Sequence, residues 1–303
     1  MNPVYVARRV YREFAATGFG DMLKDTPRYH RFIPDGFSTE QWERLIGPDG
    51  NNLHHMRQSI AVAAWFVDTE NNIKPGTFSY KEAQELTVTA AMHDQGEAVV
   101  GDIEYGRKSR NQREKEARTL VEYEASFVPK LGGMILTVYR RGQDIAFGDK
   151  MQKMPGAFKT VELMGFMNNT LSSLQQIRRL EHAALGDRYM TLLGIDSDED
   201  REAAIVALKR LTTEVLGSGV VGDLIECGKR FPSAQNYLQL HASQISKGME
   251  GVLEETFGWY DKEDPGATSG ERRRRLEKFH QQKNLWRVWI ADHSSAEVPF
   301  IAR

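Results

Sequence analysis

Apolar residues recur at helical spacing through almost the whole chain, and this periodicity restricts the fold more than any other feature of the sequence. The clearest stretches cover residues 54–67, 80–98 and 157–185, and the last of these is the longest. Apolar positions three or four residues apart lie on one face of an α-helix, whereas a half-buried strand needs strict alternation. No convincing run of alternating residues is present. The sequence therefore predicts an all-α protein.

Breaks in this periodicity divide the chain into three expected segments. Turn-forming residues gather over residues 18–52, and an acidic run at 196–200 opens a further helix by favouring its N-terminal dipole. We expect an N-terminal helix and loop over 1–52 that pack on the core, a helical core over 53–185, and a helical C-terminal extension over 186–303.

The composition of the chain argues against several classes of protein. Forty basic against 42 acidic residues give a formal net charge of −2, which argues against nucleic acid as a partner of the whole chain. The single cysteine, Cys227, excludes an internal disulfide framework and a cysteine-rich metal site. The longest unbroken apolar run, residues 60–67, is far shorter than the ~20 residues of a membrane span, and the N-terminus lacks a secretory pattern. We expect a cytoplasmic globular protein without a membrane partner.

Four consecutive arginines occur in the expected extension. They occupy Arg272–Arg275 and are followed at helical spacing by Phe279, Trp286 and Trp289. Such a run could contact nucleic acid through cations and aromatic rings, or bind the phosphates of a triphosphate substrate. The small net charge favours the alternative, an amphipathic helix with its aromatic side chains inward and its arginines in solvent.

One short block concentrates ionisable side chains at the end of an otherwise apolar stretch. If a single helix continues to about Ala98, Glu97 lies on the side that His93 and Asp94 occupy. Imidazole and carboxylate groups are ligands of divalent transition metals, and burying them without partners costs on the order of several kcal/mol. The His-Asp dipeptide alone is a weak signal, because a solvated pair at a helix end explains it equally well.

Two distant features favour the metal-site interpretation. His55 lies in the first turn of the helix over 54–67, and small or apolar side chains follow it four, five and eight positions later at Ser59, Ile60 and Ala63. A carboxylate, Glu162, stands three positions after Lys159 in the long apolar stretch. Together with His-Asp-x-x-Glu and the later Gly-Asp, this pattern resembles the HD-domain metal-dependent phosphohydrolases. Within that superfamily it is most similar to the bacterial 5′-deoxynucleotidase branch and its eukaryotic relatives, over about residues 53–170.

The resemblance implies a site for one divalent metal ion, which could be Mn, Co, Mg, Ni, Fe or Zn. Carried over by position, its ligands are His55, His93, Asp94 and Glu162. Family members usually have aspartate where Glu162 stands, so the longer side chain is a departure. Asp144 and Asp149 are the substitute ligands if Glu162 does not serve. Because no histidine lies between His93 and His182, one metal is favoured over two.

The resemblance also implies roles in catalysis and substrate binding. Glu97 is the expected general acid/base, and Asp102 is the expected acceptor for a sugar hydroxyl. Arg57, Lys108 and Lys159 are the candidate cations for the phosphate. The Arg-Trp pair that precedes the first histidine in the deoxynucleotidase branch is absent here, which leaves base and sugar preference open.

These implications together predict an enzyme of nucleotide metabolism. The expected reaction releases phosphate from (deoxy)nucleoside 5′-monophosphates through a metal-activated water. One alternative is a deoxynucleoside triphosphate triphosphohydrolase, since the extension over 186–303 could cover a larger substrate. Another is a non-catalytic nucleotide-binding HD protein, because Glu162 departs from the family pattern. A small-molecule nucleotide is the expected partner, and homo-oligomerisation stays open.

Overall fold

The chain folds into helices that pack around one long central helix. The computed structural model describes residues 2–47, 50–101, 109, 111–112, 114–115, 118–119, 133–182, 189–252, 255–256 and 268–293, with the side chains of all of these except 133–136. Within these ranges there are helices and one isolated β-bridge, between Pro27 and Asn51, but no strand, which confirms the all-α prediction. The helices are α1 (Pro3–Ala15), α2 (Gly18–Lys24), η1 (His30–Phe32), α3 (Thr39–Ile46), α4 (Asn52–Ile73), α5 (Tyr80–Ala90), α6 (Glu97–Val100), α8 (Gly133–Ala146), α9 (Lys153–Glu181), α11 (Asp198–Gly217), α12 (Val220–Gly228), α13 (Pro232–Leu240), α14 (Ala242–Lys247), η3 (Gly248–Val252) and α16 (Ser269–His293).

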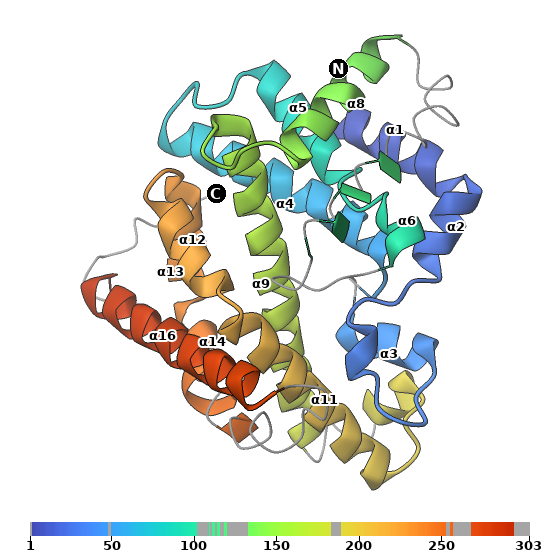
Figure 1. The fold of residues 1–303 in the computed structure, drawn as a ribbon, viewed down its shortest axis with the longest axis vertical. Coiled ribbons are helices and arrows are strands. Elements are labelled where there is room, and N and C mark those ends of the chain that lie inside the picture. The colour runs from blue at the N-terminus through green and yellow to red at the C-terminus, as the bar shows by residue number, and fades with distance from the viewer. Residues whose placement is uncertain are drawn as a thin grey trace.

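Helix α9 is the centre of the fold (Figure 1). Helices α4, α5, α11 and α12 all contact it. Its 29 residues include buried side chains around most of the circumference, because these neighbours cover it from several directions. The longest apolar stretch of the sequence is therefore the helix against which the others pack.

Side-chain caps fix where α4, which carries His55, and α5, which precedes the His93–Asp94 pair, begin. Asn51 starts α4, since its side-chain oxygen accepts the backbone N–H of His54 at 2.9 Å. Ser79 and Glu82 form a reciprocal capping box at the start of α5. A cap of this kind contributes about 0.5–2 kcal/mol to helix stability. The first turn of α4, which carries His55, is therefore held in a defined register.

Two clusters of buried apolar side chains form the interior. The larger one joins α9 to the C-terminal helices, and it includes Ile177 of α9 together with Leu208 and Leu211 of α11. The smaller one surrounds α1, α4 and α5, and α1 contributes Val6 and Val10 to it. One core thus extends across the expected boundary near residue 185, and the division into three segments stays a prediction.

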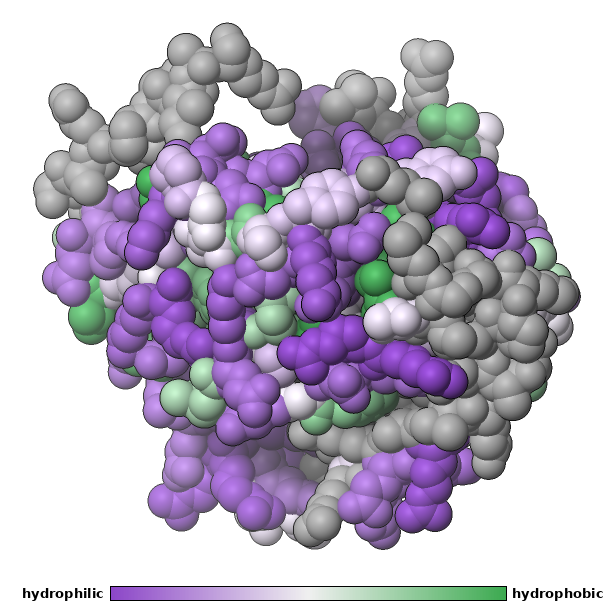
Figure 2. Space-filling view, turned by 90° about the horizontal axis from the view of Figure 1, so that it is seen from above, coloured by the Kyte–Doolittle hydropathy of each residue, from purple (hydrophilic) through white to green (hydrophobic). Residues whose placement is uncertain are grey.

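Helix α16 presents its aromatic side chains to this core. Phe279, Trp286 and Trp289 are buried, whereas Arg273 and Arg274 are exposed. This distribution confirms the inward placement of the aromatic side chains, whereas contact of the arginines with nucleic acid stays a prediction. Among the described helices, none is both long and apolar enough to cross a membrane. The face seen in Figure 2 is covered mainly by hydrophilic side chains, with apolar ones scattered among them.

Candidate metal centre

The His93–Asp94 pair lies in a turn and not on a helix. Helix α5 ends at Ala90 and α6 begins only at Glu97, so the expectation of one helix to about Ala98 is wrong. Thr89 donates its hydroxyl to the carbonyl of Glu85 at 2.8 Å, and such back-bonding weakens the last turn of a helix. Hydrogen bonds to the third preceding residue then replace the helical ladder, as from Gln95 N–H to Met92 O at 3.0 Å. Side chains of consecutive residues on a regular helix point about 100° apart. In this turn, by contrast, the side chains of His93 and Asp94 lie close together.

The structure brings three of the expected ligands together. Donor atoms of His55, His93 and Asp94 lie within 4.8 Å of one another. Oδ2 of Asp94 is 3.1 Å from Nε2 of His93 and 3.5 Å from Nε2 of His55. The two imidazole rings meet edge to face with centroids 5.3 Å apart. Both histidines are buried, so the group lies below the surface and not at a solvated helix end.

The hydrogen-bonding pattern of His93 fits a cation at this point. Its Nδ1 lies 3.1 Å from the carbonyl oxygen of Ala90, which can only accept, so Nδ1 carries the proton. Nε2 then directs a lone pair at Oδ2 of Asp94, and a metal ion or a second proton between these electron-rich atoms stabilises the pair. Burial lowers the pKa of His93, but the carboxylates of Asp94 and Glu162 raise it by more, so it lies above its ordinary value. Two imidazoles and a carboxylate are also a donor set that suits Mn, Fe, Co or Zn.

Glu162 stands beside this group without belonging to it. Its charge is near enough to raise the pKa of His93, but its Oε2 contacts Nζ of Lys159 at 3.1 Å. Among the described residues, the group with mutually close donor atoms consists of the other three ligands. Whether Glu162 turns from Lys159 to serve as the fourth ligand stays a prediction.

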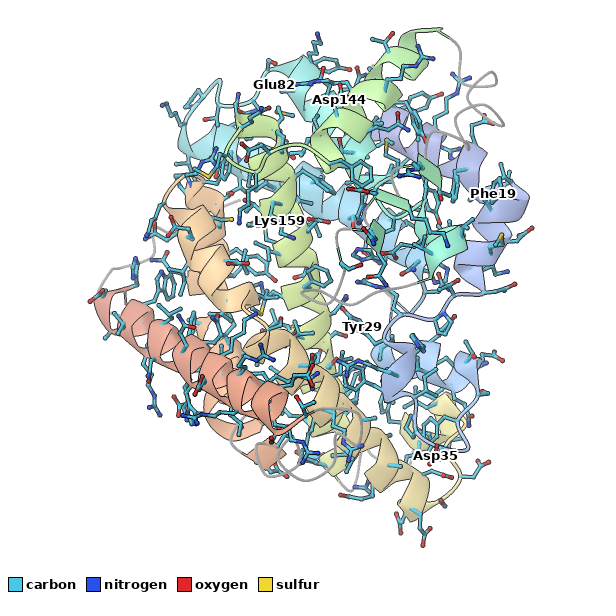
Figure 3. The ribbon with its side chains drawn as sticks, viewed as in Figure 1. Phe19, Tyr29, Asp35, Glu82, Asp144 and Lys159 are labelled. Carbon is cyan, nitrogen blue, oxygen red and sulfur yellow. The ribbon has the colours of Figure 1, made fainter. Side chains whose placement is uncertain are left out.

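The two substitute ligands lie elsewhere. Asp144 on α8 is largely exposed and pairs with Arg141 at 3.5 Å. Figure 3 labels it at the upper end of the molecule, away from Lys159. Asp149 accepts the backbone N–H of Met151 at 2.9 Å. Neither carboxylate joins the group around His93.

Glu97 is buried and is held by a residue that the sequence reasoning missed. Nδ2 of Asn52 donates to Oε2 of Glu97 at 2.8 Å, and both side chains are almost fully buried. Asn52 is the first residue of α4, three positions before His55, so the same helix turn positions the expected acid/base and one expected ligand. The available signal was a second asparagine directly after the helix cap, one turn before the histidine.

The cationic side chains that were expected to bind the phosphate differ in their position relative to the candidate metal centre. Lys159 is part-buried beside Glu162. Arg57 is exposed and lies about 200° around α4 from His55, on the other side of the helix. It is instead close to Tyr11 of α1, whose pKa burial raises and the charge of Arg57 partly lowers. Asp102 and Lys108 lie outside the described residues.

Comparisons with protein-family models, with curated proteins and with solved structures find no match to this chain. Its function is therefore inferred from the chemistry of the buried group and of the side chains around it.

Proposed function

We propose that this protein is an HD-domain metal-dependent phosphohydrolase that releases phosphate from (deoxy)nucleoside 5′-monophosphates. The observation that carries the proposal is the buried group of His55, His93 and Asp94, in which Nε2 of His93 lies 3.1 Å from a carboxylate oxygen of Asp94. Buried groups of this kind need a cation, and the resemblance over residues 53–170 points to a divalent metal. The buried carboxylate of Glu97, whose backbone N–H donates to the carbonyl of Asp94 at 2.9 Å, supports hydrolysis over metal storage.

The metal ion and the side chains have different roles in the proposed reaction. When bound, a divalent ion lowers the pKa of water from 15.7 towards ~7 and neutralises charge on phosphoryl oxygens. His55, His93 and Asp94 would hold it, with Glu162 as the fourth ligand. Glu97 takes the proton from the attacking water and returns it to the leaving sugar oxygen. Asn52 keeps the carboxylate of Glu97 in place, and Lys159 supplies positive charge for the phosphate.

Purified protein loaded with Mn²⁺ or Co²⁺ is expected to release inorganic phosphate from a panel of deoxynucleoside 5′-monophosphates. A chelator should abolish the release, and added metal should restore it, because the nucleophile depends on the ion. Colorimetric phosphate assays measure both effects. Glu97→Gln is the matched control: it should keep the metal and lose about 10²–10⁴-fold in kcat.

The outcomes of this assay separate the alternatives. Release of triphosphate from deoxynucleoside triphosphates would identify the triphosphohydrolase. Protein that purifies without metal, turns over no nucleotide with any of several metals and still binds nucleotide would reject the proposal in favour of the non-catalytic binding protein.

Asn52→Ala is expected to lower kcat by about 10–100-fold, the usual effect of removing a partner that orients a functional group. Because Asn52 contacts Glu97 and not the ligands, KM and the metal content should stay unchanged. Steady-state kinetics together with metal analysis measure the three quantities. Asn71→Ala is the matched control, since it removes an amide near the other end of α4 whose hydrogen bonds go to the backbone of Phe78, and it should lower stability without changing kcat. Loss of metal from Asn52→Ala would show that Asn52 supports His55 instead.

A further inference from the structure

A groove between α4 and α9 reaches His55 of the candidate metal centre. Its volume is about 160 Å³, close to that of a cavity known to admit a single six-membered ring. His55 lies at one end of it, and Gly165 of α9 leaves room there, since a Cβ at that position would lie 3.6 Å from Cε1 of His55. The remaining lining side chains come from one face of each helix and from the end of α3: Gln58, Ser59, Val62, Asn168, Asn169, Ser172 and Ile46.

The chemistry of this lining selects an uncharged occupant. Three amides and two hydroxyls offer both donors and acceptors, and Val62 and Ile46 add apolar surface. Among the described residues that line the groove, His55 is the only ionisable one. A phosphate placed there would lose its hydration without gaining a cation, which is costly. A neutral ring with polar edges would find partners for its edges and apolar contact for its faces.

Two tyrosines hold the amides of α9 in fixed orientations. The hydroxyl of Tyr237 lies 2.6 Å from Oδ1 of Asn168, and burial raises the pKa of Tyr237, so the phenol stays protonated and donates. This bond occupies the oxygen of Asn168 and leaves its Nδ2 donors for a ligand. Nδ2 of Asn169 donates to the hydroxyl of Tyr29 at 3.3 Å, which leaves its Oδ1 as an acceptor. Because both residues line the groove, an Nδ2 donor of Asn168 and the Oδ1 acceptor of Asn169 can serve the polar edge of a ring there.

The charged and uncharged ends of the site follow one another along α9. Lys159 and Glu162 come first, then Gly165 beside His55, then the two asparagines. Figure 3 shows the same order, with Lys159 beside the upper part of α9 and Tyr29, the partner of Asn169, farther down. A nucleotide with its phosphate at the metal centre would thus direct its base away from Lys159.

We propose that this groove binds the uncharged heterocyclic base of the substrate, with Asn168 and Asn169 as the residues that recognise its edge. The assignment rests on the proposed function, because it takes the phosphate end to lie at His55. It extends that function by naming the residues that determine which leaving group is accepted. A buried hydrogen bond to such a group is worth about tenfold in affinity.

Calorimetric titration of the full-length protein with the four deoxynucleosides tests the groove without any need for turnover. We expect saturable binding of at least one of them, and about tenfold weaker binding in Asn168→Ala. Tyr237→Phe removes the hydroxyl that orients Asn168 but keeps the Asn168 amide, so it should weaken binding by a smaller factor. Gln175→Ala is the matched control, since it removes an exposed amide of α9 that does not line the groove. No saturable binding of any deoxynucleoside, or equal affinity in Asn168→Ala, would overturn the proposal.

Kinetics with the metal-loaded protein separate this proposal from the proposed function. Asn168→Ala should lower kcat/KM about tenfold for deoxynucleoside monophosphates and leave 2-deoxyribose 5-phosphate, which lacks a base, unchanged. An equal loss for both substrates would overturn the groove assignment. Absence of turnover in the wild type would reject the phosphohydrolase, and the calorimetric result would then decide the groove alone.

Discussion

Replacing Asp94 by asparagine is expected to remove the metal from the protein. The carboxylate is the only anion in the group of three, and its Oδ2 lies within 3.5 Å of Nε2 of both histidines. Even partners that merely orient a metal ligand are worth about 10–100-fold in affinity, so the loss of a charged ligand should exceed about 100-fold. Metal analysis of the purified protein, followed by titration with Mn²⁺ or Co²⁺, measures the change. Phosphate release should disappear together with the metal.

Two further variants make this result specific. Asp144→Asn, which alters a carboxylate outside the group, should retain the metal and serves as the matched control. Glu162→Gln then tests the fourth ligand separately: a loss of metal comparable to that of Asp94→Asn would place Glu162 in the coordination sphere. Full metal occupancy in Asp94→Asn would contradict the assignment of the centre.

Gly217→Ala is expected to destabilise the fold by about 1–3 kcal/mol, the usual effect of overpacking a core. Gly217 ends α11 where α16 packs against it, and a Cβ there would lie only 1.9 Å from Cδ1 and Cε1 of Phe279. Phe279 is buried, so its ring cannot turn away into solvent. Thermal or urea unfolding of the variant measures the loss of stability.

The double variant Gly217→Ala/Phe279→Leu tests the cause of this effect. If the ring is the obstacle, the two substitutions together should cost less than the sum of their separate effects. Gly18→Ala is the control, because nothing lies within 4 Å of a Cβ at that position in α2. A wild-type unfolding midpoint for Gly217→Ala would mean that α16 does not pack on α11 at this point.

Part of the structure could be predicted from the sequence alone, because it depends on the spacing and type of nearby residues. Apolar spacing identified α4, α5 and α9, because a helix exposes every third or fourth side chain to the same neighbour. The aromatic residues of α16 fell on its inner face for the same reason. His55, His93 and Asp94 could be selected as a metal group, since imidazole and carboxylate at such spacing are costly to bury without a cation.

Other features of the site depend on tertiary packing and could not be predicted from local sequence patterns. The end of α5 at Ala90 depends on turn hydrogen bonds, which a periodic apolar pattern continuing to Ala98 concealed. The contact of Asn52 with Glu97 joins residues 45 positions apart, and it exists only because α4 lies against the turn that follows α5. The groove along α9 likewise follows from how α4 and α9 approach each other. Residue spacing along each helix was enough to predict which side chains face inward. Which of these side chains meet depended on the packing of distant helices, because helix periodicity sets the direction of a side chain about its own axis but not the distance to the neighbouring helix.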